Sequence, residues 1–117
     1  MEQELLRDIK SLNRLLSRRT ENHNAYHLLA GKYDKLFDFT HEREYSEQAL
    51  LNHNRAVDLA PNNPLYRIDR AKFLARIDMP FAEDFVYVDE CIRNGTCDVV
   101  EPVIMMYVQN TLRDLRR

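Results

Sequence analysis

The sequence predicts an all-α protein, a short antiparallel array of about six helices. Three observations predict this fold class. Glycine occurs twice and proline four times among 117 residues, while the helix-favouring Leu, Ala, Arg and Glu are frequent. Apolar residues recur with a period near 3.6 in successive segments. Apolar residues make up 44% of the chain and charged residues 31%, so we expect one ordered domain with a buried core.

The first three helices are predicted over residues of about 3–19, 23–42 and 46–60. In the first, leucine and isoleucine follow a helical spacing at Leu5, Ile9, Leu12 and Leu16. The polar stretch 20–22 that follows offers a break and an N-cap. The third helix ends before Pro61, because proline disfavours a helical residue before it and lacks an N–H group.

The remaining helices are predicted over about 64–77, 80–94 and 98–117. Asn63 and Pro64 suit the N-cap and first turn of the fourth helix. Its expected buried positions are Leu65, Ile68, Ala71 and Leu74 or residues next to them. Apolar side chains mark the fifth helix at Phe81, Phe85, Val88 and Ile92. Asp98 and Glu101 form a pair similar to a capping box at the start of the last helix.

Two segments resemble the halves of a tetratricopeptide repeat. The first half is carried by Tyr26, Leu29, Ala30 and Tyr33, and the second by Ala49, His53, Ala56 and Pro61. Seven additional residues separate the halves, which predicts a first helix about two turns longer than usual. The resemblance implies one domain with a flanking helix at 1–20, a repeat at 23–61, a degenerate repeat at 62–95 and a capping helix at 98–117.

The resemblance also implies that the chain binds a partner peptide or helix, as an adaptor or small chaperone. In this family the first helix of each repeat lines a groove. The corresponding positions carry His27, Asp34, Lys35, Asp38, Ile68, Lys72 and Arg76. The chain lacks the clamp of Lys, Asn and Arg with which some family members hold a C-terminal carboxylate, because His27, Gly31 and Asp69 stand at the clamp positions. The alternative is that these residues form an ordinary solvated face.

The segment 103–108 contains six consecutive apolar residues, which on a helix point to every side. A terminal helix with one neighbour would leave part of this run exposed. We therefore expect the preceding helices, a second copy in a homodimer or another protein to cover it. The expected contact residues are Val103, Met105, Met106 and Tyr107.

Other site classes have weaker signals. His23 and His27 are four residues apart but make an incomplete metal site, and no catalytic or cofactor motif is present. We therefore expect no enzyme activity, no metal and no cofactor. Cys91 and Cys97 are expected to be thiols, with a disulfide as the alternative.

The net charge and the hydropathy of the chain indicate which partners and which cell compartment to expect. The net charge is −2, so no overall field attracts nucleic acid. No apolar run is long enough to cross a membrane and no signal peptide is recognisable, so we expect a cytoplasmic protein. Neither nucleic acid nor a membrane is the expected partner. A weaker alternative is contact with either through the basic stripe of the first helix, formed by Arg7, Lys10, Arg14 and Arg18.

Overall fold

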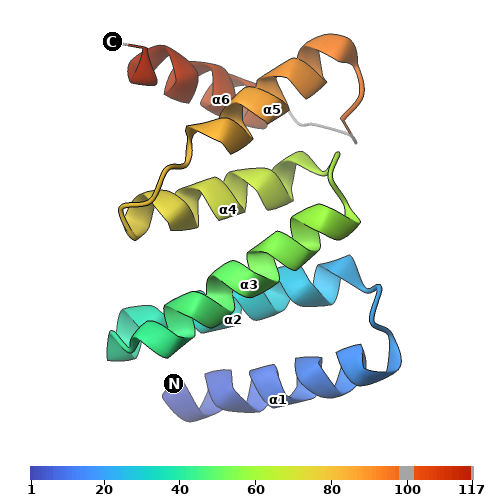
Figure 1. The fold of residues 1–117 in the computed structure, drawn as a ribbon, viewed down its shortest axis with the longest axis vertical. Helices are drawn as coiled ribbons and strands as arrows, with labels where there is room; N and C mark the ends of the chain where they lie inside the picture. Colours follow the sequence, from blue (N-terminus) through green and yellow to red (C-terminus); the bar gives the residue numbers. More distant parts are fainter. Residues whose placement is uncertain (98–101, 117) are drawn as a thin grey trace. The chain divides into compact units, whose positions relative to one another are not determined.

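The computed structural model describes residues 1–97 and 102–116, and the described residues contain α-helices and no strand (Figure 1). The helices are α1 (Glu2–Arg18), α2 (His23–Thr40), α3 (Arg43–Leu59), α4 (Pro64–Arg76), α5 (Ala82–Asn94) and α6 (Pro102–Leu115). The all-α prediction is confirmed. The predicted capping pair Asp98 and Glu101 lies outside the described residues.

The chain divides into two compact units, Met1–Leu59 and Ala60–Arg117, which we call unit 1 and unit 2. The division falls close to Pro61, where the first predicted repeat ends. The described residues of each unit form three helices, and within each unit successive helices run in opposite directions (Figure 1). The units are therefore described separately below.

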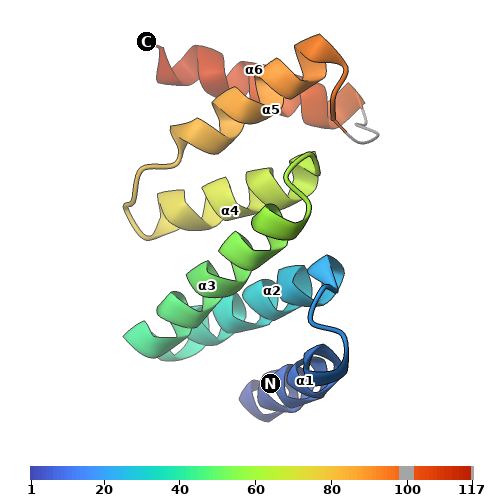
Figure 2. The same cartoon turned by 45° about the vertical axis from the view of Figure 1, so that its right-hand side comes forward.

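Unit 1 is built from α1 and the paired helices α2 and α3, which lie side by side in both ribbon views (Figure 2). One face of α1 packs on α2 through buried leucine and isoleucine side chains. These residues, with their partners on α2, are Leu5, Ile9, Leu16, Ala25, Leu29 and Leu36. Small buried side chains, Ala30 on α2 and Ala49 and Ala56 on α3, allow helix axes to approach closely.

The helix boundaries around residue 41 differ from the prediction. α2 ends at Thr40 rather than near 42, and α3 begins at Arg43 rather than 46. His41 adopts a left-handed conformation (φ 57°) that terminates α2. The Thr40 hydroxyl accepts a hydrogen bond from the Glu42 N–H at 3.2 Å, which stabilises the tight turn into α3.

α2 and α3 are long relative to the helices that follow. They contain 18 and 17 residues, against 13 in each of α4 and α5. The difference is at least one helical turn. The predicted elongation of the second helix relative to a standard repeat stays a prediction.

Unit 2 packs α4, α5 and α6 around one apolar cluster. Its buried members are Ile68, Ala71, Phe85, Val88, Val108 and Leu112. The prediction that Leu65 is buried is wrong, since it is exposed, and Leu74 is only half-buried. α4 instead buries Tyr66 and Phe73, which share a face because they lie two turns apart. Burial raises the pKa of the Tyr66 hydroxyl.

The N-terminus of α4 has a side-chain cap, whereas the N-terminus of α5 has none. The Asn63 side chain caps α4 by accepting from the N–H groups of Leu65 and Tyr66, and Pro64 occupies the first turn, as predicted. α5 begins at Ala82, two residues after the predicted start at Pro80. Phe81 precedes it without a side-chain cap, and its ring packs against Phe85.

A buried ion-pair network joins α4 to α5. The Asp84 carboxylate accepts from Arg70 Nε at 2.8 Å and Arg70 Nη2 at 2.5 Å, and from Arg67 Nη1 at 3.3 Å. The Arg67 guanidinium also lies over the Tyr87 ring, 3.4 Å from its centroid, and its Nε donates to the Pro61 carbonyl. Since the carboxylate has three charged hydrogen bonds, we assign these residues a structural role.

The two glycines give a matched test of backbone conformation. Gly31 lies inside α2, and a Cβ built there meets nothing within 4 Å. We expect Gly31→Ala to raise the free energy of unfolding by about 1 kcal/mol, through helix propensity. Gly95→Ala should lower it by about 1–2 kcal/mol, because Gly95 has a φ of +66°.

Urea unfolding followed by circular dichroism measures both changes. The wild-type chain is the reference, and the slope of the transition should be unchanged. If both substitutions destabilised the protein by similar amounts, the open space assigned to Gly31 would be contradicted.

Candidate functional site

Among the described residues of unit 2, the most exposed large apolar side chains lie on α6. Val103 is 66% exposed and Met106 is 61% exposed, and Tyr107 is also exposed. Met105 is half-buried, while Val108 is fully buried. Part of the run 103–108 is therefore exposed in the described part of the chain. Its role as a contact with a second copy or a partner stays a prediction.

The structure places one predicted groove residue beside this run. Lys72 on α4 holds its Nζ atom 4.8 Å from the centroid of the Tyr107 ring. The Tyr107 ring also contacts the ring of Phe85, with centroids 5.9 Å apart. A cation over an aromatic face contributes about 0.5–1 kcal/mol at an exposed site. We name Val103, Met106, Tyr107 and Lys72 together the α6 surface.

The other groove positions on α4 separate into buried and exposed residues. Ile68 belongs to the apolar cluster of unit 2 and is buried. Its burial agrees with the expected core positions of the fourth helix, and a buried side chain is not accessible to a groove in this conformation. Arg76 is exposed in the last turn of α4.

The predicted groove positions of α2 belong to unit 1. His27 and Asp34 are half-buried, whereas Lys35 and Asp38 are exposed. Asp34 and Lys35 lie between the buried positions Leu29 and Leu36, whereas His27 precedes them and Asp38 follows them. Their role in binding stays a prediction.

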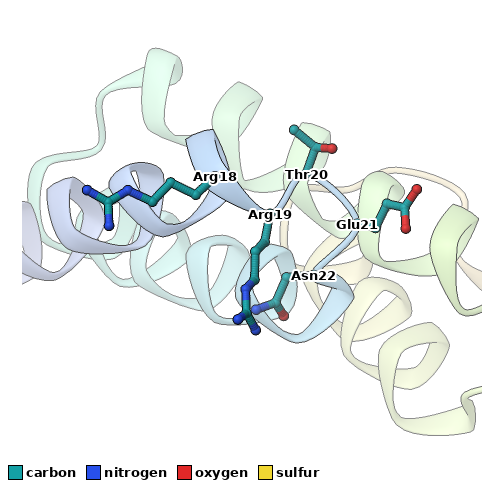
Figure 3. A pocket seen from close by; sticks show the side chains of 5 residues that line it. All are labelled: Arg18, Arg19, Thr20, Glu21 and Asn22. Carbon is teal, nitrogen blue, oxygen red and sulfur yellow. The ribbon is translucent and has the colours of Figure 1, made fainter.

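The basic stripe of α1 is solvent-exposed. Arg7, Lys10, Arg14 and Arg18 are all exposed on the helix whose other face buries Leu5, Ile9 and Leu16. At the end of α1 a depression of about 460 Å³ is lined by residues 18–22. Figure 3 shows Arg19 beside Asn22, while Arg18, Thr20 and Glu21 point in other directions. These side chains do not converge on one ligand position.

A second depression lies between α5 and α6 and has a volume of about 330 Å³. Its lining residues include three arginines against one acidic residue. The lining residues are Asp89, Arg93, Gln109, Asn110, Leu112, Arg113 and Arg116. We name it the α5–α6 pocket. Sequence reasoning missed it, because the spacing of arginines on two helices does not reveal that they share a cavity.

The described residues offer little for metal or thiol chemistry. Across 1–97 and 102–116 no group of three or more His, Cys, Asp or Glu side chains could hold a metal ion. Cys91 is buried and Cys97 half-buried, and both are thiols rather than a disulfide. The Cys91 sulfur accepts a hydrogen bond from the Thr96 hydroxyl at 3.3 Å.

No helix within the described part of the chain is both long and apolar enough to cross a membrane. Comparison with protein-family models, with curated proteins and with solved structures gave no match.

Proposed function

We propose that the chain is a non-catalytic protein-interaction module that binds a helical or extended segment of a partner protein on the α6 surface. The observation that carries this proposal is the exposure of Val103 and Met106, at 66% and 61%, on a helix whose other face is buried. Large exposed apolar side chains grouped on one face mark interaction sites more often than isolated ones do. Met106 also has the flexible side chain that suits an adaptable contact.

The resemblance to tetratricopeptide repeats supports the same role. Four of its positions, Leu29, Ala30, Ala49 and Ala56, are buried in unit 1. This is the arrangement that closely packed repeat helices require. A repeat-like origin of the fold is part of the proposal, and proteins of that family bind peptides.

The size and charge of the α6 surface favour a short partner segment over a stable homodimer. A standard interface uses roughly 20–30 residues on each side, whereas this surface offers three apolar side chains. The ammonium group of Lys72 lies at its edge, over Tyr107. We therefore propose a segment with apolar anchor residues and at least one acidic residue.

A peptide selection tests the proposal. Random peptides are selected on the wild-type chain, and affinities are measured by fluorescence anisotropy. We expect Met106→Asp and Val103→Asp each to weaken the selected peptides by about tenfold or more, since each places a charge where an apolar anchor binds. Leu51→Asp is the matched control, because Leu51 is an exposed leucine on α3. It should leave affinities unchanged.

Two outcomes count against the proposal. The first is that no selected peptide distinguishes Met106→Asp from Leu51→Asp. The second comes from light scattering: a wild-type dimer that Met106→Asp converts to a monomer would make a second copy the occupant of the α6 surface.

A further inference from the structure

The α5–α6 pocket holds an excess of positive charge. Arg93, Arg113 and Arg116 line it, and Asp89 is the only acidic residue among its lining residues. Each guanidinium carries five N–H donors, and together they exceed what one carboxylate can accept. A depression with this lining attracts an oxyanion and repels a metal cation.

Two of the arginines are oriented by neighbouring side chains. The buried Asp89 carboxylate accepts from Arg93 Nη2, with Oδ2 and Nη2 3.0 Å apart. Arg113 Nη2 donates to Asn110 Oδ1 at 2.9 Å. A guanidinium that is already held in place loses less side-chain entropy when it binds a ligand.

The pocket continues the α6 surface along the helix. Met106, Asn110 and Arg113 are spaced i, i+4 and i+7, so they share one side of α6. Asn110 and Arg113 line the pocket. From Met106 to Arg113 the helix rises about 10 Å. A segment of a few residues can therefore contact the apolar and the basic parts together.

We infer that the α5–α6 pocket is an oxyanion subsite that binds the carboxylate of an acidic side chain in the partner segment. This inference rests on the proposed function of the α6 surface. The apolar anchors of the segment contact Val103 and Met106, while its Asp or Glu side chain accepts hydrogen bonds from Arg113 and Arg116. Arginine suits this role because its planar fork matches the two oxygens of a carboxylate.

A double-mutant cycle tests the subsite. The probes are the selected peptides that depend on Met106, synthesised with amidated C-termini so that only side chains supply carboxylates. Each peptide is compared with its Asp→Asn or Glu→Gln analogue on the wild type, Arg113→Gln and Arg116→Gln. We expect the amide analogue to bind the wild type about tenfold more weakly. On Arg113→Gln and on Arg116→Gln the difference between the two peptides should be smaller than on the wild type, because each variant removes one of the two cations that contact the carboxylate.

Arg43→Gln is the matched control, since Arg43 is an exposed arginine on α3 that pairs with Glu47. It should preserve the preference for the acidic peptide. Thermal unfolding should show that Arg113→Gln and Arg116→Gln remain folded, because both side chains are exposed.

The outcomes separate the two proposals. Selected peptides that depend on Met106 but bind equally as acid and amide would overturn the oxyanion subsite and leave the α6 surface intact. Independent, additive losses from Arg113→Gln and from the amide analogue would also overturn it. A selection without any Met106-dependent peptide would remove both proposals.

Discussion

Asp84→Ala is expected to lower the free energy of unfolding by about 3–5 kcal/mol, which is the usual range when one partner of a buried ion pair is removed. Asp84 is buried, and the side chain of its partner Arg70 is only 18% exposed. Without the carboxylate, the guanidinium groups of Arg67 and Arg70 would be left partly desolvated between α4 and α5. Equilibrium unfolding in urea measures the loss, and hydrogen exchange should locate it in these two helices.

Asp89→Ala is the matched control for this prediction. Asp89 is also buried on α5, but its partner Arg93 has a side chain that is 68% exposed. Water can therefore solvate the arginine after the substitution, and we expect a smaller loss than for Asp84→Ala. Equal losses from the two variants would contradict the structural role given to the Asp84 network.

The second large effect is expected in unit 1. Leu29→Ala should lower the free energy of unfolding by about 2–5 kcal/mol, because it removes buried methyl groups and leaves a cavity among tightly packed neighbours. Leu29 is 1% exposed and belongs to the cluster with Leu5, Ile9 and Leu36. The loss is measured by urea unfolding, with protection from hydrogen exchange monitored in α1 and α2.

The adjacent residue provides the control. Leu28 is 44% exposed on the same helix, so Leu28→Ala removes the same atoms without creating a cavity. Its effect should stay within about 0.5 kcal/mol. A large loss from Leu28→Ala, or a small one from Leu29→Ala, would show that α2 packs through a different face.

Local signals in the sequence predicted most of the helices correctly. Asn63 and Pro64 mark the start of α4, and the helical spacing of Leu5, Ile9 and Leu16 identifies the buried face of α1. The exposure of Val103 and Met106 was also predictable, because six successive apolar residues cannot all face one neighbour. These features depend on residues within a few positions of one another.

Features formed by distant residues were not predictable. Asp84 pairs with Arg70 and Arg67, 14 and 17 residues away, and nothing in the spacing of charges selects those partners. The exposure of Leu65 has a related cause. α4 has apolar residues on several sides, and only its neighbours in the fold decide which of them are buried. The α5–α6 pocket likewise exists only once the two helices have packed.

The turn before α4 is stabilised by hydrogen bonds to residues of unit 2. The Pro61 carbonyl accepts from Arg67, the Asn62 side chain accepts from the Tyr87 hydroxyl, and the Asn63 N–H donates to the Ala60 carbonyl. These bonds all lie on the C-terminal side of Leu59. A gene fusion, duplication or insertion at the bond between Leu59 and Ala60 would therefore preserve them. We therefore expect the chain to tolerate exchange or lengthening of its segments at the boundary between Leu59 and Ala60.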